Sequence, residues 1–162
     1  MATIIYLEIN GVCEVENKII GIALEGKEGD SDSQTLAKFI RQGLDQLESV
    51  GVPDNKKLLG TFEEDNGHPR TFNLLNEITS RPPLLQFRVN RSVPGAFRAI
   101  FFEYEYQGEQ LLVFTKALLK TGDPNPPELQ QAIEDSYKIY LDFLKSPEKY
   151  LEGNEFNEQE KS

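Results

Sequence analysis

Basic side chains recur along apolar segments in the middle of this 162-residue chain. They are Arg88, Arg98, Lys116 and Lys120. Residues 67–120 carry 7 basic and 4 acidic groups, whereas residues 1–66 carry 6 and 13, and residues 121–162 carry 4 and 10. Arginine binds phosphate as a planar charged fork and lysine as a point charge. The middle of the chain is therefore a candidate anion-binding surface, although solvated acidic flanks alone are the commoner origin of such charge runs.

The composition excludes several other kinds of site. Cys13 is the single cysteine and His68 the single histidine, so a disulfide framework, a multi-cysteine metal site and a histidine-pair zinc site are all excluded. The net charge of −10 argues against a protein that coats nucleic acid or membrane with its whole surface. No apolar run approaches the ~18 residues of a membrane span, and the N-terminus has no basic leader. We therefore expect a cytoplasmic protein without membrane contact.

Three strands are expected to carry the basic residues. Residues 84–90 alternate between apolar and polar side chains, which is typical of a strand with one buried face. Residues 96–106 and 109–116 are apolar on both faces, as in central strands covered on both sides. Short turns separate the three segments, at Pro94-Gly95 and Gln107-Gly108. Because such turns join only antiparallel neighbours, we predict that the strands pair antiparallel in sequence order.

Two amphipathic helices are expected on either side of these strands in the sequence. Residues 33–50 place their apolar side chains in one stripe at three- and four-residue steps. Residues 126–144 do the same, and they begin with a proline whose missing N–H costs nothing at a helix start. The sequence therefore predicts an α+β fold, in which a small antiparallel sheet packs against helices.

The two ends of the chain and residues 54–80 are less regular. Asn10-Gly11 lies between apolar runs within residues 4–24, which favours an N-terminal hairpin. Residues 54–80 are predicted to contain one short helix and a surface loop. Residues 1–150 are expected to form one domain that includes the extra hairpin, and residues 151–162 a disordered acidic tail.

The succession of a helix, three strands and a helix resembles the RelE/ParE superfamily of toxins, and most closely its phage-derived HigB-like branch. That branch carries an "ELRV" strand, a "YRILY" strand, an apolar strand ending in "F-x-KK", a Thr-Pro segment and a closing helix. The corresponding segments here are LQFRV at 85–89, FRAIFFEY at 97–104 and LLVFTK at 111–116, before Lys120-Thr121 and the proline-led helix. The resemblance covers residues 32–143.

The resemblance implies a RelE-like fold and a ribosome-dependent mRNA endoribonuclease of a toxin–antitoxin system, without metal or other cofactor. In such a site positive groups lie beside the scissile phosphate, while an acid and a base assist attack by the 2′-hydroxyl. Matched to the motifs, the candidate catalytic residues are Arg88, Arg98, Lys116 and Lys120. Tyr104 and Tyr106 are the candidates for stacking on RNA bases. The expected partners are an antitoxin protein, the ribosome and mRNA, and a homodimer stays open.

A non-catalytic protein-interaction module on the same fold is the alternative. The family's adjacent lysines are here separated by Ala117-Leu118-Leu119, and His68 lies outside the motif, which favours this alternative. Each candidate also has an ordinary structural explanation. Exposed lysines and an ion-paired Arg88 are common on surfaces, and the tyrosines suit a core or its rim. Arg98 shares a strand face with Ile100, so it suits a buried bridge to an acid.

Arg88 and Arg98 flank the turn region at residues 90–96 almost symmetrically. Antiparallel strands joined by a turn place such residues opposite one another, so we expect them to form one positive patch with Lys116 or Lys120. Like charges in that position repel by an amount comparable to a favourable pair, ~0.2–1 kcal/mol. A phosphate-binding surface gains from this arrangement, whereas a purely structural sheet gains only if acids lie between the cations.

Overall fold

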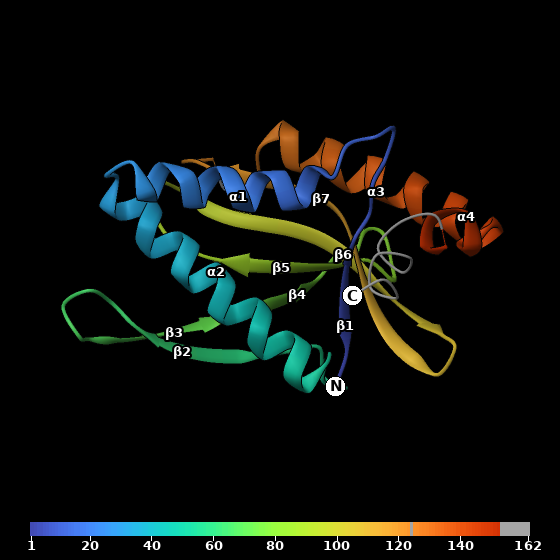
Figure 1. Cartoon of the computed structure of the whole chain (residues 1–162), viewed down its shortest axis with the longest axis horizontal. Helices are drawn as coiled ribbons and strands as arrows, with labels where there is room; N and C mark the ends of the chain where they lie inside the picture. Colours follow the sequence, from blue (N-terminus) through green and yellow to red (C-terminus); the bar gives the residue numbers. More distant parts are fainter. Residues whose placement is uncertain (124, 153–162) are drawn as a thin grey trace.

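The chain forms a five-stranded sheet with helices on both faces, in a computed structural model that describes residues 1–123 and 125–152 (Figure 1). The strand order is β1-β7-β6-β5-β4. The bounds are Thr3–Tyr6 for β1, Glu109–Lys120 for β7, Ala96–Tyr106 for β6, Leu85–Val89 for β5 and Leu75–Glu77 for β4. A separate two-stranded sheet pairs β2 (Leu59–Glu63) with β3 (Pro69–Asn73).

Helices cover the two faces of the sheet with separate apolar cores. Helices α1 (Glu14–Lys27) and α2 (Ser31–Val50) lie on one face, and α3 (Pro127–Lys145) on the other, followed by α4 (Pro147–Leu151) (Figure 1). The alternation along β6 divides the side chains between them, because neighbouring residues of a strand face opposite ways. Phe101 packs in the core of α1 and α2, whereas Ile100 and Phe102 pack in the core of α3.

The expected central strands and the two long helices are confirmed. Strands β5, β6 and β7 pair antiparallel in sequence order, and α2 and α3 pack on opposite faces of the sheet. The sheet as a whole is not antiparallel, however, because β1 pairs parallel with β7 and aligns Thr3 with Leu111. The sheet is therefore mixed, and β1 is its edge strand beside β7.

The expected N-terminal hairpin is wrong beyond its turn. Asn10-Gly11 does reverse the chain, with one isolated bridge between Ile9 and Val12, but the following residues form α1. Val15 and Ile22 are buried against the sheet at helical spacing. The apolar run that ends this segment is short, and such runs suit a strand or a helix equally.

Residues 54–80 also differ from the prediction of a short helix and a loop. They contain β2, β3 and β4, with Thr61 paired to Thr71 across the β2–β3 hairpin. At the C-terminal end, Leu151 belongs to α4 and is buried, so the expected tail does not begin there. The rest of the tail, residues 153–162, lies outside the described residues. Within the described part of the chain, no helix combines the length and apolarity that a bilayer span requires.

Candidate anion-binding site

Arg88 and Arg98 are directly opposite one another on β5 and β6. Arg98 is buried, with 8% of its surface exposed, and its Nη1 donates a hydrogen bond to the backbone carbonyl of Phe97 at 3.2 Å. Arg88 Nε donates to the backbone carbonyl of Asn73 at 3.1 Å. Among the described residues, neither guanidinium forms an ion pair with a carboxylate. The ordinary explanation for a buried arginine, a bridge to an acid, therefore does not apply here.

The electrostatic consequence is a lowered pKa for both arginines. Burial and the neighbouring Arg88 lower the pKa of Arg98 from 12.5 to about 10. Burial also lowers the pKa of Arg88. A guanidinium with a pKa of about 10 remains protonated at neutral pH, so two partly desolvated positive charges stand side by side. A bound anion would offset the unfavourable burial of these charges.

A cavity of about 410 Å³ opens beside Arg98 at the end of β6 and β7. Its lining residues are Arg70, Asn90, Arg91, Ser92, Ala96, Arg98 and Lys120. Lys120 is paired with Ala96 across the strands, two residues from the Arg98–Leu118 pair, so Lys120 and Arg98 lie on the same face. A Cβ atom on Gly95, whose φ is +156°, would lie 2.8 Å from the backbone oxygen of Lys120. Glycine thus lets the β5–β6 loop close against β7 and bring Lys120 to the cavity.

Arg70 and Arg91 both line the cavity and both contact the carboxylate of Glu64. Arg91 Nη1 lies 2.9 and 3.1 Å from the two oxygens of Glu64, and Arg70 Nη1 lies 3.3 Å from one of them. Arg70 Nη2 also donates to the backbone carbonyl of Asn90 at 3.1 Å. The Nε of Arg91 is buried and has no hydrogen-bond partner within the described structure. One acid therefore orients two arginines, and their combined charge stays positive.

The sequence did not single out Arg70 and Arg91. Arg70 lies on the β2–β3 hairpin, in a segment predicted as a helix and loop, and its approach to β5 is a tertiary contact without a local sequence pattern. The excess of basic groups over residues 67–120 was the one available signal, since it includes both arginines. We give the name basic cluster to five residues: Arg70, Arg91, Arg98 and Lys120, which line the cavity, and Arg88, which does not line it but lies directly opposite Arg98.

Three candidates from the sequence are not part of the basic cluster. Lys116 Nζ lies 3.1 Å from a carboxylate oxygen of Glu14 on α1, so this lysine joins the sheet to a helix. Tyr104 is six residues beyond Arg98 on β6, which is about 20 Å along a strand. Its ring packs edge-on against Phe143 of α3, with 4.9 Å between ring centroids.

The second tyrosine is at the same remote end of β6. The rings of Tyr104 and Tyr106 are stacked 6.4 Å apart, and the Tyr106 hydroxyl donates to Glu152 at 2.9 Å. Stacking of the tyrosines on the same nucleotides that the basic cluster binds stays a prediction, and it requires an RNA that extends along the whole strand.

The basic cluster can bind and neutralise an anion, but its cavity offers no evident proton acceptor. As described, the lining contains cations, Asn90, Ser92 and Ala96, without a carboxylate or an imidazole. His68 is exposed in the turn between β2 and β3 and is not among the lining residues. The side chains are therefore suited to holding phosphate and stabilising negative charge on it.

No family model, curated protein or solved structure matches this chain.

Proposed function

We propose that the protein binds RNA through the basic cluster and acts as a RelE/HigB-like toxin of a toxin–antitoxin system, cleaving mRNA on the ribosome without a metal ion. The observation that carries this proposal is the pairing of Arg88 with Arg98, without a carboxylate partner for either among the described residues. Such a pair is unfavourable in an empty sheet and favourable around a phosphate.

The fold and the distribution of charge support the same proposal. The α2, β5, β6, β7 and α3 elements follow in the order on which the resemblance rests, and the two arginines occupy the corresponding strands. The chain carries a net charge of −10, so RNA is repelled by most of the surface and attracted at the basic cluster. A local site of this kind suits a single RNA strand presented by a larger assembly.

The proposed cleavage is a transfer of the phosphate from one ribose oxygen to another. The 2′-oxygen forms a bond to phosphorus while the bond from phosphorus to the leaving 5′-oxygen breaks. The proton of the 2′-hydroxyl passes to a base, and the leaving 5′-oxygen takes up a proton from water to give a 5′-hydroxyl. Arg98 and Lys120 would stabilise the negative charge that develops on the phosphate oxygens. Because the described cavity lining holds no carboxylate or imidazole, we assign the base to a nitrogen or phosphate oxygen of the ribosome-bound RNA. This assignment makes cleavage depend on the ribosome.

Binding is tested with a fluorescein-labelled 12-nucleotide single-stranded RNA and the full-length protein at low salt. We expect Arg88→Met and Arg98→Met each to weaken binding by about tenfold, because Arg98 lines the cavity and Arg88 places a second positive charge directly opposite it. The matched control is Arg81→Met, since Arg81 is bound by Glu134 with contacts of 2.7 and 3.0 Å on the face of α3. Equal affinities for all four proteins would contradict the proposal.

Cleavage is tested by induced expression in a bacterial host, with growth and full-length mRNA measured over time. We expect wild-type protein and Arg81→Met to arrest growth and shorten mRNA, and Arg98→Met to do neither at the same protein level. If the expressed wild-type protein binds RNA but full-length mRNA stays intact, the proposed nuclease activity is contradicted.

RNA binding without loss of mRNA would instead support the alternative, a non-catalytic interaction module. The specific observation in its favour is that Lys116, a candidate catalytic lysine, is bound by Glu14, while the described cavity lining supplies no base.

A further inference from the structure

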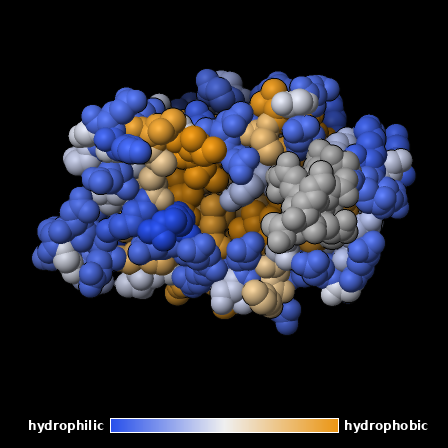
Figure 2. Space-filling view, in the orientation of Figure 1, coloured by the Kyte–Doolittle hydropathy of each residue, from blue (hydrophilic) through white to orange (hydrophobic). Residues whose placement is uncertain are grey.

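A second cavity, of about 550 Å³, lies between α1 and α2 on the opposite face of the sheet from Arg88 and Arg98. Figure 2 shows an apolar hollow at this position, bordered by hydrophilic side chains. Its apolar lining includes Ile4 of β1, Ile19 of α1 and Leu44 of α2. We call this cavity the α1–α2 groove. The basic cluster and the groove can therefore be occupied independently.

Helices α1 and α2 are in close contact near the loop that connects them, and they diverge away from it. A Cβ atom on Gly26 would lie 2.6 Å from the Cα atom of Gln34, so the backbones of α1 and α2 are in contact there. Farther along, the small side chains Ala23 and Ala37 line the groove and leave it open. Ile20 and Leu24 extend the apolar surface over the outside of α1, with exposed fractions of 48% and 53%. The exposed apolar surface therefore extends beyond the residues that line the groove.

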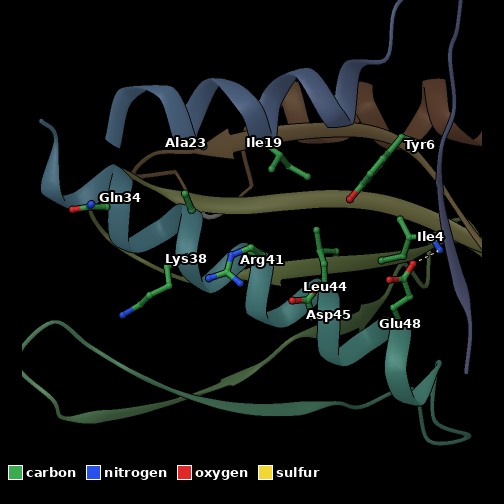
Figure 3. A pocket seen from close by; sticks show the side chains of 11 residues that line it. Ile4, Tyr6, Ile19, Ala23, Gln34, Lys38, Arg41, Leu44, Asp45 and Glu48 are labelled. Carbon is green, nitrogen blue, oxygen red and sulfur yellow. Dashed lines mark hydrogen bonds between the residues drawn. The ribbon is translucent and has the colours of Figure 1, made fainter. Parts of the chain in front are cut away.

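Charged side chains follow one edge of the groove at helical spacing. On α2, Lys38 and Arg41 come first and Asp45 and Glu48 one to three turns later, and Figure 3 shows them in that order along the helix. From Lys38 to Glu48 this edge advances by ten residue steps, or about 15 Å of helix. Within the described residues, Arg41 and Asp45 have no ion-pair partner. The groove thus has a positive end and a negative end.

Tyr6 adds a polar group to an otherwise apolar floor. Its hydroxyl points into the groove (Figure 3) and makes no hydrogen bond to another described residue. An added β-strand does not fit the nearby edge of β1, because the backbone N–H of Ile4 already donates to a carboxylate oxygen of Glu48 at 3.0 Å. The edge is therefore closed to strand addition at this residue, and a helix is the better occupant.

We propose that the α1–α2 groove binds an amphipathic helix of about three turns from a partner protein, running antiparallel to α2. The partner helix would place its apolar face on Ile19 and Leu44 and a hydrogen-bonding side chain near the Tyr6 hydroxyl. An α-helix is positive at its N-terminus and negative at its C-terminus. In the antiparallel direction, its first turn meets the unpaired Asp45 and its last turn meets the unpaired Arg41. Lys38 already donates to the backbone carbonyl of Glu63, and Glu48 already accepts from Ile4, so Arg41 and Asp45 carry the preference for direction. This inference does not depend on RNA binding.

Two designed peptides of 14 residues test the proposal. Both carry leucines on one face; the first has lysines in its first turn and glutamates in its last, and the second has the reverse order. We expect the wild-type protein to bind the first peptide about tenfold more tightly than the second, by fluorescence anisotropy. The double variant Arg41→Asp/Asp45→Arg should reverse this preference, because it exchanges the two unpaired charges of the edge.

Ala23→Leu should weaken binding of both peptides about tenfold, because it fills the groove. Its matched control, Gln131→Leu, lies on α3 and should leave peptide binding unchanged. Every groove variant should give the circular-dichroism spectrum of the wild type, which shows that it is folded whether or not the protein binds RNA. An RNA affinity equal to that of the wild type would in addition separate this proposal from the preceding one.

Three results would overturn the proposal. The first is failure of both peptides to bind, and the second is a ratio of the two peptide affinities that the double variant leaves unchanged. The third is a concentration-dependent dimer, seen by sedimentation, that Ala23→Leu abolishes. The last result would identify a second copy of this chain as the occupant.

Discussion

Arg88 faces Arg98 across the β5–β6 pair, and among the described residues no carboxylate lies in ion-pair contact with either guanidinium. The arrangement is unfavourable in the free protein, because like charges directly opposite one another destabilise a sheet and Arg98 is buried. The residues that flank the pair offer carbonyl oxygens from Phe97 and Asn73, which satisfy single N–H groups but do not neutralise charge. Stability and anion binding should therefore respond to these residues in opposite directions.

Replacing Arg98 should separate the two effects. We expect Arg98→Met to raise the free energy of unfolding by ~0.5–1 kcal/mol, because it removes the repulsion from Arg88 and keeps an apolar chain of similar length. Urea unfolding at pH 7 measures this change. A loss of more than ~1 kcal/mol would show that Arg98 stabilises the fold, and the phosphate-binding interpretation would then be wrong.

Lys120 and Lys116 provide a comparison within one strand. Lys120 lines the cavity, whereas Lys116 is bound by Glu14. We expect Lys120→Ala to reduce the slope of log affinity for single-stranded RNA against log salt by about 0.7, the value for one lost phosphate contact. Lys116→Ala should leave that slope unchanged. Equal slopes for the two variants would remove Lys120 from the proposed site.

Tyr104 is expected to stabilise the fold rather than the complex with RNA. Its ring contacts Phe143 and Tyr106, so Tyr104→Ala should lower the free energy of unfolding by about 2–3 kcal/mol through lost packing. Tyr104→Phe keeps the ring and should change neither stability nor RNA affinity. If Tyr104→Ala retains stability but loses RNA affinity, the stacking role predicted from the sequence is supported instead.

The stability at alkaline pH should depend on Tyr6. Burial, followed by the charge of Glu48, raises the pKa of Tyr6 from 10.0 to about 12. Between these two values the unfolded chain loses the phenol proton while the folded protein retains it, so stability falls as the pH rises from 10 to 12. Tyr6→Phe should match the wild type at pH 9 and be the more stable protein at pH 11.5. Parallel curves of unfolding free energy against pH would contradict this assignment.

A hydroxyl pair should contribute to the docking of α3. Thr115 Oγ1 lies 2.7 Å from Ser136 Oγ, and both residues are buried. We expect Thr115→Val to lower the free energy of unfolding by about 1–2 kcal/mol, because the Ser136 hydroxyl loses its partner in a buried position. Adding Ser136→Ala should then cost less than it does in the wild type, which a double-mutant cycle measures. Strictly additive losses would show that the two hydroxyls do not interact.

Elements with strong local patterns were predictable from the sequence. The turn at Gln107-Gly108 and the apolar segments around it led to the β6–β7 pair, and the apolar stripe of residues 33–50 led to α2. The parallel pairing of β1 with β7 was not predictable, because it joins residues about 100 positions apart without a local sequence signal. The same is true of the β2–β3 hairpin, in which β3 is largely exposed and lacks a buried apolar face.

The candidate site was predictable where it depends on strand register. Arg88 and Arg98 were expected to meet, because residues equidistant from a turn pair across antiparallel strands. The sequence left open whether Lys116 or Lys120 joins the two arginines, and the structure places Lys120 at the cavity and Lys116 against Glu14. The helix that carries Glu14 was not expected, so this ion pair could not be foreseen. Arg70 and Arg91 depend on a loop and a hairpin that approach the sheet through Glu64. Such contacts follow from tertiary packing, and no regular spacing of residues in the sequence indicates them.

The parallel pairing of β1 also affects when the fold can be completed during synthesis. Thr3–Tyr6 leave the ribosome early, but their partners on β7 begin at Leu111. At ordinary translation rates this separation corresponds to roughly 5–20 s. Until β7 emerges, the backbone N–H and C=O groups of β1 have no strand to pair with, and the basic cluster lacks Lys120. A nascent chain thus cannot form the complete cluster while most of the protein is still being made, so any activity of the site is confined to nearly finished molecules.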